Sequence, residues 1–478
     1  MAWAQYLPKD RIKWTDGINS TPIWPSEPDV AVIKDIVPGA LGGKSDDVSV
    51  QYLADGAHHK IYEVTHPSHP RPYLFRVAVP VDPCLKLESE MATLEFLRQR
   101  TTVPVPRPIV WSSTRANKMG YEWALVEKIP GVELRDVWRE IPWEKKVQII
   151  QTVASYLAQL WNTSQRFSRI GSLYFSTYRE DGEAPSKDSQ TSVDVSPSSS
   201  LPTPRQVASP EEASNHGFIV GPSIDGAFFA GRRRYLDVYR GPYESCRAWL
   251  GSLIRIEQEF IRTARILIEK RGEMTSDHIS EDWSDLMDEI GVDEDDFMDD
   301  YKDMVATCAE YERLLPSVFP HQDPHDNPRF CLHHCDLREA NILVDPETFE
   351  ITGIIDWEQT CTVPDWYGVD YPLVINKHEP LNPGVEPPVP KTYDVDSDEY
   401  NAPQVAERDR WEAKLLRERF DYQLENLGFK DWRPKARDHA LKSRFIEGVG
   451  ELAENWERSR YQLKKIYEML KELELGEH

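Results

Sequence analysis

The amino-acid sequence predicts an α+β fold of two lobes, a small antiparallel sheet with one helix followed by a larger, mainly helical lobe. Three observations lead to this prediction. Short runs rich in β-branched and aromatic residues follow one another from Val48 onward. A segment with apolar residues at helical spacing interrupts these runs once. In the rest of the chain, long stretches carry apolar residues at helical spacing.

The small lobe is predicted over residues 46–130. Its first three strands, VSVQYL, KIYEV and YLFRVAV, are separated by Asp55-Gly56 and by a loop of prolines and histidines, which is typical of an antiparallel meander. The next segment, CLKLESEMATLEFLRQR, has the apolar spacing of a helix, and the prolines that follow it end that helix. The run YEWALVEKI is then expected to form a buried strand, which Pro130-Gly131 closes.

The larger lobe is predicted over residues 131–478. The main amphipathic helices expected in it are 143–161, 245–271 and 434–474. Two tracts inside this lobe, at about 180–215 and 378–403, are rich in proline and polar residues and are predicted to be disordered inserts. Residues 1–45 carry several turn signals and are expected to form an N-terminal extension that packs on the domain.

Charge and composition exclude several kinds of partner. The 478 residues carry a formal net charge of -25, so nucleic acid, which needs a basic surface, is not expected as a partner. No run approaches the roughly 18 apolar residues of a membrane span, and the N-terminus lacks the pattern of a secretory signal. Six scattered cysteines suit a reducing compartment better than a disulfide framework. We therefore expect a cytoplasmic protein without a membrane partner, whose oligomeric state the sequence leaves open.

One stretch combines strand-like runs with the polar residues that phosphoryl transfer needs. In LHHCDLREANILVDPETFEITGIIDWE, Asn341 follows Asp336, and Asp356 ends the second of two strands that turn at Asp345-Pro346. A carboxylate can accept the proton of a substrate hydroxyl, while an amide oxygen and a second carboxylate can hold Mg²⁺, which prefers oxygen ligands. A hairpin brings the residue at its start beside the residue at its far end, so Asn341 and Asp356 can share one metal ion.

The pair of motifs HxDxxxxN and IIDWE resembles the aminoglycoside phosphotransferase and choline kinase-like family, in its fungal type, and more distantly the protein kinases. The resemblance implies a protein kinase-like fold in which ATP lies between the lobes. It implies that Asp336 is the catalytic base and that His334 orients the catalytic loop. Asn341 and Asp356 are the implied Mg²⁺ ligands. In EWALVEKIPG, the backbone from Glu127 to Ile129 is the implied contact of the adenine.

Two features of the small lobe depart from the family pattern. The third strand offers Arg76 where many relatives have Lys, and Arg stays charged and can hold phosphate through two hydrogen bonds. Its expected partner is Glu90 in the following helix, with Glu88 as the alternative. The turn expected to cover the phosphates, ADGAHHKIY, has Gly56 as its single glycine. The histidine pair next to it is therefore expected to assist the backbone amides.

Together these features predict an ATP- and Mg²⁺-dependent phosphotransferase that moves the γ-phosphoryl group to a hydroxyl of a small molecule. A small acceptor is favoured over a protein because Trp357-Glu358 follows the second metal ligand, where protein kinases usually have Phe-Gly, and no Ala-Pro-Glu segment follows. Asp365 and Asp370 are expected on the acceptor side. The alternative is a catalytically weak relative that binds nucleotide or a partner, for which Arg76 and the single glycine are the reasons. The sequence does not identify the acceptor.

Overall fold

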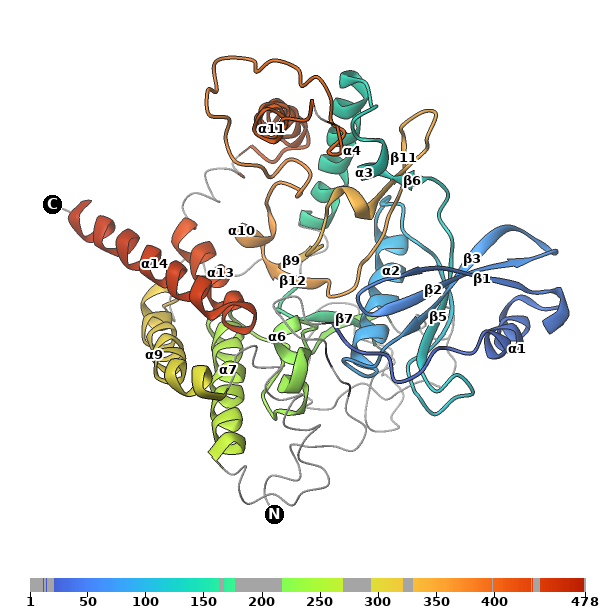
Figure 1. Ribbon diagram of the computed structural model, residues 1–478, viewed down its shortest axis with the longest axis horizontal. Coiled ribbons are helices and arrows are strands. Elements are labelled where there is room, and N and C mark those ends of the chain that lie inside the picture. Colours follow the sequence, from blue (N-terminus) through green and yellow to red (C-terminus); the bar gives the residue numbers. More distant parts are fainter. Residues whose placement is uncertain are drawn as a thin grey trace, which may run out of the picture.

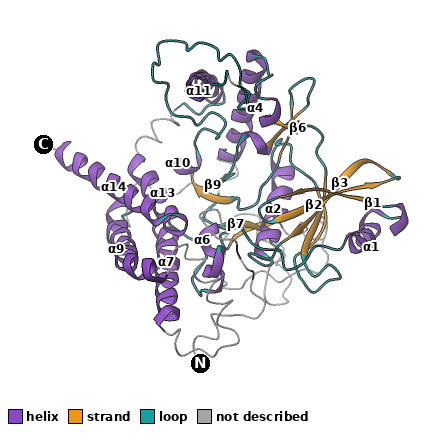
Figure 2. Ribbon diagram, viewed as in Figure 1, coloured by secondary structure: helices purple, strands orange, loops and turns teal. Residues whose placement is uncertain are grey.

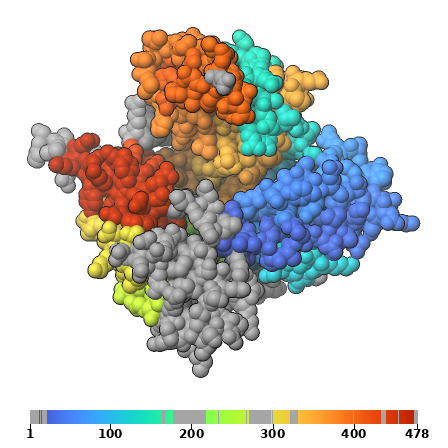
Figure 3. All heavy atoms as spheres, viewed as in Figure 1, coloured from blue at the N-terminus to red at the C-terminus, as the bar shows by residue number. Residues whose placement is uncertain are grey.

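The computed structural model describes residues 12, 14, 21–162, 167–176, 217–269, 294–320, 330–397, 399–430, 432 and 439–476. Its main sheet lies on one side and the C-terminal helices lie on the other, with α2 (Leu85–Arg100) between the sheet and the rest of the chain (Figure 1, Figure 2). In the space-filling view, the N-terminal part in blue and the C-terminal helices in red occupy opposite sides of the molecule (Figure 3). The predicted α+β class, with a small antiparallel-sheet lobe and a mainly helical larger lobe, is confirmed.

The small lobe is built on one antiparallel sheet in the strand order β1-β2-β3-β5-β4. Its strands are β1 (Ser49–Asp55), β2 (His59–His66), β3 (His69–Ala78), β4 (Pro108–Ser112) and β5 (Glu122–Glu127). The first three form the predicted meander, and α2 follows where the apolar spacing predicts a helix. On β3, Arg76 lies opposite Ile61 of β2 and Ala124 of β5, which places it in the interior of the sheet.

A helix that the sequence does not predict, α1 (Val30–Leu41), precedes the sheet. Its first turn is capped by Asp29, whose side chain accepts the backbone N–H of Ala31 at 2.8 Å. Pro38 is a turn signal in the sequence, yet it lies in the last turn of α1. The helix nevertheless continues past it, because the N–H of Gly42 closes on the Pro38 carbonyl. Apolar residues of α1 share a buried cluster with the sheet, so this part of the N-terminal extension packs on the small lobe.

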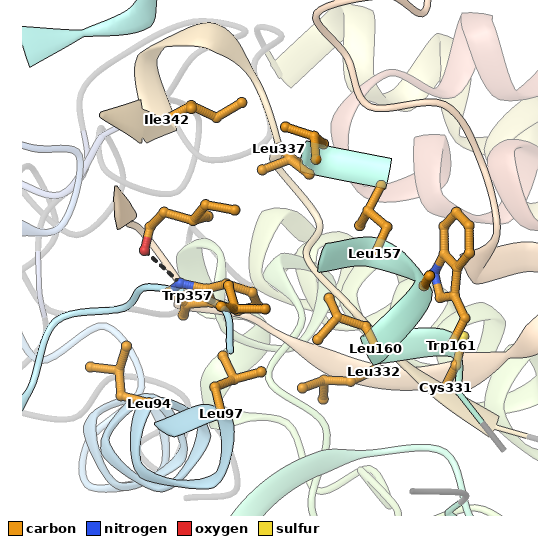
Figure 4. Close-up of a cluster of buried hydrophobic side chains, with 14 of the residues drawn as sticks. Leu94, Leu97, Leu157, Leu160, Trp161, Cys331, Leu332, Leu337, Ile342 and Trp357 are labelled. Carbon is orange, nitrogen blue, oxygen red and sulfur yellow. Dashed lines mark hydrogen bonds between the residues drawn. The ribbon is translucent and has the colours of Figure 1, made fainter. Parts of the chain in front are cut away.

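Helix α2 lies between the sheet and the larger lobe, and most of its residues are buried. Its leucines join a hydrophobic core with leucines of α4 (Trp143–Trp161) and with Trp357 (Figure 4). Burying each such side chain contributes about 1.5–3 kcal/mol, so this core fixes α2 to the larger lobe. The same helix buries three charged side chains, Lys86, Glu88 and Glu90, and the exposed fractions of Lys86 and Glu90 are 5% and 2%. Buried charges need partners, and these three are described below with the candidate site.

The order of strand, loop and hairpin predicted around residues 330–358 is present in the larger lobe. The hairpin strands β10 (Ile342–Val344) and β11 (Ile351–Ile354) pair antiparallel, and β10 also pairs with β6 (Val132–Glu133). Beside them, β9 (Phe330–His333) pairs with β12 (Cys361–Pro364). The chain therefore leaves β9 into the loop before β10, and returns from β11 to β12.

Gly131, directly after the predicted adenine-binding segment, approaches this hairpin closely. Its φ is +123°, a backbone conformation that L side chains rarely adopt. A Cβ atom at this position would lie 2.6 Å from the carbonyl oxygen of Val344 in β10 and 2.6 Å from the hydroxyl of Thr352. Both the backbone conformation and the space therefore require glycine.

We expect Gly131→Ala to lower the free energy of unfolding by about 2 kcal/mol, because alanine must adopt a strained φ and displace β10. Gly384→Ala is the matched control, since nothing lies within 4 Å of the Cβ it would add and its φ is ordinary. That variant should change stability by less than about 0.5 kcal/mol. Urea unfolding of both proteins measures the difference, and equal stabilities would contradict the constraint at Gly131.

Four long helices of the larger lobe share a second hydrophobic cluster. They are α7 (Cys246–Glu269), α9 (Glu294–Val318), α13 (Ala440–Glu454) and α14 (Trp456–Gly476). The single C-terminal helix predicted from the apolar spacing is two helices. The break lies at Asn455, which has an extended backbone and whose side chain accepts the N–H of Arg458 at 3.0 Å. Asparagine is a preferred residue at a helix start, so this residue type carried the missed signal.

The two tracts predicted to be disordered differ in what the structure describes. The tract at 180–215 lies outside the described residues. In the tract at 378–403, residues 378–397 and 399–401 are described and form no helix or strand, and α11 (Ala402–Asn426) begins at the end of the tract. Side chains of α11 hold its backbone: Lys414 donates to the carbonyl of Pro383 at 3.0 Å and Arg408 to that of Pro387 at 3.2 Å. Among the described helices, none is long and apolar enough to cross a membrane.

Candidate active site

The loop between β9 and β10 brings two of the predicted catalytic and metal-binding residues into contact. The side-chain amide of Asn341 donates to the backbone carbonyl of Asp336 at 2.8 Å and to its carboxylate at 3.1 Å. Arg338 reaches the same carboxylate oxygen, with Nε 2.9 Å from Oδ2. The Asp336 side chain is nevertheless 41% exposed. Its carboxylate is therefore fixed in position and still open to a substrate.

His334 is buried beneath this loop in one defined tautomer. Its Nε2 lies 3.1 Å from the carbonyl oxygen of Ile355, and its Nδ1 lies 3.2 Å from the backbone nitrogen of Asp336. The carbonyl accepts and the amide donates, so Nε2 carries the proton and the ring is neutral. Burial lowers the pKa of His334 to about 4, which agrees with a neutral ring. These contacts hold the backbone of Asp336, the task that the resemblance implies for His334.

We expect the wild-type protein to lose stability in acid more steeply than His334→Gln. The pKa of His334 is about 4 in the folded state against 6.5 for an ordinary histidine, so the unfolded state binds the proton first as the pH falls. Stability present above pH 6.5 is then lost toward pH 4, by up to about 3 kcal/mol. Glutamine can still donate to the Ile355 carbonyl, but it does not titrate.

Urea unfolding at several pH values across this window measures the two slopes. His378→Gln, at an exposed histidine, is the control and should keep the wild-type slope. Parallel pH profiles for wild type and His334→Gln would contradict a neutral, buried His334.

Asp356 joins the catalytic loop from the far end of the hairpin. The backbone N–H of Ile355 donates to the carbonyl of Asn341 at 3.0 Å. Asn341 directly precedes β10 and Asp356 follows β11, so the two predicted metal ligands lie at the same end of the hairpin. Asp356 has a φ of 62°, in the left-handed region. A residue other than glycine costs energy there, and such strain is concentrated at functional sites.

The ionised form of Asp356 is disfavoured where it lies. Burial, and then the neighbouring Glu358 carboxylate, raise the pKa of Asp356 to about 7, although Arg76 and Lys86 act in the opposite direction. Glu90 adds a further negative charge. A cation bound here would remove this penalty, because it favours the ionised carboxylate.

Arg76 extends from β3 and forms an ion pair with Glu90 of α2. Glu88, the alternative partner, is engaged elsewhere: it accepts hydrogen bonds from the Trp111 indole at 3.1 Å and from the Ser113 hydroxyl at 2.6 Å. The predicted pairing of Arg76 with Glu90 is therefore confirmed.

Short contacts link Arg76 to the segment that carries Asp356. The Nη2 atom of Arg76 lies 3.5 Å from Nδ1 of His59, and that Nδ1 lies 3.3 Å from the carboxylate of Glu358, two residues after Asp356. Burial lowers the pKa of Arg76, but Glu90, and after it Glu358 and Asp356, raise it above the ordinary value. The cation from the sheet therefore belongs to the same network of charges as the end of the hairpin. The sequence predicts both residues, and the fold brings them together over 280 positions of the chain, from 76 to 356.

Glu358 is the centre of a set of contacts that the sequence does not predict. Lys86 of α2 forms an ion pair with it. The Nδ1 atoms of His58 and His59 lie 3.2 Å and 3.3 Å from its two carboxylate oxygens. All three partners belong to the small lobe, so Glu358 ties the turn before β2, and α2, to the larger lobe. Lys86 lies one helical turn before Glu90, and this spacing is the signal that could have assigned it to the same face.

His59, Glu90 and Glu358 each bring one possible ligand atom to within 4.8 Å of the others. The two carboxylates already pair with Arg76 and Lys86. Burial, and after it the positive charges of Lys86 and Arg76, lower the pKa of His59 well below its ordinary value. A divalent cation between them would meet two fixed positive charges. This group is therefore an ion-pair network, and Asn341 with Asp356 remain the better pair of metal ligands.

Comparison with known families agrees with this geometry. The profile described as "Phosphotransferase enzyme family" matches residues 49–194 and 197–367, from β1 into α10 (Asp365–Gly368). The match covers more than half of the chain. The chain belongs to the Phosphotransferase enzyme family. The matched ranges contain all the site residues described above.

Individual relatives of the chain are distant. A subtelomeric hrmA-associated cluster protein of Aspergillus fumigatus is 25% identical over 72% of this chain and 64% of its own length. The mitochondrial protein "Altered inheritance of mitochondria protein 9" of Clavispora lusitaniae is 26% identical over 46% of this chain and 36% of its own. The chain thus spans less than two thirds of the length of either relative. The solved ethanolamine kinase of Plasmodium vivax has a TM-score of 0.36 at 12% identity, over 88% of this chain and 83% of that one.

The backbone amides of the predicted nucleotide contacts differ in whether they are already paired. No hydrogen bond or ion pair among the described residues links Gly56, Glu127 or Ile129 to Asp336. The N–H of Gly56 donates to the His59 carbonyl at 2.7 Å, and that of Glu127 donates to the Arg107 carbonyl at 2.9 Å. The N–H of Ile129 has no backbone partner in the part of the chain that the structure describes. Of these three amides, Ile129 is therefore the one available to a ligand.

A cavity of 140 Å³ lies beside the catalytic loop, on the side where the acceptor is expected. It is lined by His334 and Cys335 from the loop and by Asp370 and Tyr371 beyond α10, among others. Burial raises the pKa of Asp370. Asp370, predicted on the acceptor side, thus borders this cavity, whereas Asp365 begins α10 and is not among the lining residues.

Proposed function

We propose that this phosphotransferase moves the γ-phosphoryl group of ATP, bound with Mg²⁺, to a hydroxyl of a small molecule. The observation that supports this most is the convergence of Asp336, Asn341 and Asp356 from one hairpin and its preceding loop, opposite Arg76. Phosphoryl transfer depends on positioning and on stabilising charge rather than on protein covalent chemistry. A fixed carboxylate, two oxygen ligands and a buried cation supply these functions.

In this proposal Asp336 receives the proton of the acceptor hydroxyl. The hydroxyl oxygen bonds to the γ-phosphorus while the bond from that phosphorus to the ADP oxygen breaks. The carboxylate suits this role because it is partly exposed and is held by Asn341. His334 positions it indirectly, through the backbone N–H of Asp336.

The residues fit Mg²⁺. Asn341 uses its amide nitrogen for Asp336, which leaves the amide oxygen as the atom able to bind a cation. Asp356 carries a buried carboxylate whose ionisation a cation would favour. Oxygen ligands of this kind are those that Mg²⁺ prefers. When bound, Mg²⁺ would offset the negative charge of the β- and γ-phosphates.

For the nucleotide, Arg76 is the proposed phosphate contact and the Ile129 N–H the proposed adenine contact. Arg76 is held by Glu90 and keeps its charge, as a phosphate contact requires. The N–H of Ile129, which has no backbone partner among the described residues, lies two residues before Gly131, whose close approach to β10 holds this segment.

One observation favours the second candidate, a nucleotide- or partner-binding module with little catalysis. His58 and His59 contact the carboxylate of Glu358. The N–H of Gly56, the single glycine of their turn, donates to the carbonyl of His59 and is therefore not available to a phosphate. Phosphates would have to displace these histidines or be covered without a glycine-rich loop. A protein that only binds would tolerate this arrangement more easily than a fast enzyme.

A thermal-shift screen of hydroxyl-bearing metabolites with Mg-ADP, followed by ADP-release assays with the hits, tests the proposal. We expect Mg-ADP alone to raise the melting temperature and at least one hydroxyl compound to raise it further and to be phosphorylated. Nucleotide binding without turnover on any compound would favour the binding module. Absence of any shift with Mg-ADP would contradict both the phosphotransferase and a nucleotide-binding module, and would leave partner binding alone.

A further inference from the structure

The side chain of Cys335 is exposed to solvent in the catalytic loop, directly before Asp336. Its thiol donates to the carbonyl of Gln359 at 3.3 Å and lies 4.0 Å from the carbonyl of His333. All six cysteines are in the described part of the chain, and Cys335 alone is exposed. Cys84, Cys246, Cys308 and Cys331 are buried. An oxidant from solution would therefore reach Cys335 first.

Cys361, at the start of β12, is the thiol beside it. In the ladder between β9 and β12, Cys361 pairs with His333, whose carbonyl contacts the Cys335 thiol. Cys335 also contacts the carbonyl of Gln359, two residues before Cys361. Both contacts bring the Cys335 thiol to the first residue of β12. Because Cys361 lies directly opposite His333 and two residues after Gln359, the two carbonyls that the Cys335 thiol contacts flank Cys361 on both strands.

We propose that Cys335 and Cys361 are a modification site, at which a disulfide forms reversibly and reduces phosphoryl transfer. The oxidant is a low-molecular-weight disulfide. The Cys335 thiolate attacks one of its sulfurs, which gives a mixed disulfide and releases one thiol. The Cys361 thiolate then attacks the Cys335 sulfur and releases the second thiol. The protein loses two protons and two electrons, and the two released thiols carry all of them.

The expected loss of activity follows from the position of Cys335 and rests on the proposed function. A disulfide requires the sulfurs to approach to about 2 Å, so the Cys335 thiol must leave the Gln359 carbonyl. The backbone that moves with it continues directly into Asp336, whose N–H is held by His334. A small displacement of the catalytic carboxylate is enough to slow transfer strongly.

Peptide mapping of the full chain after incubation with oxidised glutathione tests the site without any activity assay. We expect a pair of peptides cross-linked between Cys335 and Cys361. Fragment ions should assign the cross-link to Cys335 and not to Cys331, and the cross-linked pair should disappear after reduction. Cys361→Ser should stop at a glutathione adduct on Cys335, and Cys335→Ser should give no cross-link. Cys308→Ala, remote in α9, is the control and should cross-link as wild type does. Absence of the pair, or a cross-link of Cys335 to another cysteine, would overturn the site.

The activity arm uses the ratio of oxidised to untreated rate within each protein. Wild type and Cys308→Ala should fall at least tenfold and recover after reduction, while Cys335→Ser and Cys361→Ser should stay within about twofold of their own untreated rates. A cross-linked protein with an unchanged rate would overturn the effect on transfer but not the site. If no reduced protein turns over, the proposed function fails, and the mapping still decides whether the disulfide forms.

Discussion

Replacing Asp336 with asparagine should lower the rate of phosphoryl transfer by about 10³-fold while leaving the affinity for Mg-ADP within about twofold. The amide keeps the size of the carboxylate and can still accept from Asn341, but it cannot take the hydroxyl proton. Transfer to the acceptor found in the metabolite screen measures the rate, and calorimetric titration with Mg-ADP measures the affinity. Removal of a base that acts in the transition state predicts this separation of rate from binding.

Asp345→Asn is the matched control, because it makes the same change at the turn of the same hairpin. Asp345 accepts the N–H groups of Glu347 and Thr348 there, and an asparagine can accept them as well. Its rate should stay within about twofold of wild type. A wild-type rate in Asp336→Asn would remove Asp336 from the chemistry, and an equal loss in both variants would point to damage of the hairpin instead.

The parts of the site that could be predicted are those encoded locally. Asp336, Asn341 and Asp356 lie within 21 residues, and the hairpin that joins them is visible in its strand-like runs and turn. Arg76 and Glu90 are likewise a strand residue and a residue of the next helix, 14 positions apart, and they form the predicted ion pair. Short separations leave few alternative arrangements, so residue type and spacing are enough.

The contacts of Glu358 could not be predicted in the same way. Its ion pair with Lys86 joins residues 272 positions apart, and its contact with His58 joins residues 300 apart. Which lysine or histidine meets it depends on how the two lobes pack, and the leucines of α2 that fix this packing carry no information about the charges. A buried lysine on the face of Glu90 was the single local hint.

The prediction of secondary structure was wrong at two residues whose type is compatible with more than one local structure. Pro38 is a turn signal in the sequence, yet it lies inside α1, where its missing N–H removes the hydrogen bond to the carbonyl of Lys34. Asn455 fits the apolar spacing of one long helix, yet its side chain starts a second helix. In both cases the packing of the apolar faces decided the outcome, in one cluster with the sheet and in another with α7 and α9.

Asp356→Asn should have opposite effects on stability and on function. In the free protein, burial and the Glu358 carboxylate raise the pKa of Asp356 from 3.8 to about 7. A carboxylate with a raised pKa stabilises the fold below its unfolded value, and this contribution is lost as the pH rises from about 4 to about 7. At pH 8 the neutral asparagine avoids that loss, so the variant should be more stable than wild type by roughly 2 kcal/mol.

The same substitution should abolish the extra stabilisation that Mg²⁺ gives to ADP binding, because the buried anion that the cation would neutralise is gone. Transfer should fall by about 10³-fold or more. Melting curves at pH 6 and pH 8, with ADP alone and with Mg-ADP, measure both effects, and Asp345→Asn again serves as the control. A variant that is stabilised at pH 8 but no longer responds to Mg²⁺ would show that Asp356 is retained at a cost to stability. A variant that binds Mg-ADP as tightly as wild type would instead show that the metal ion takes its ligands elsewhere.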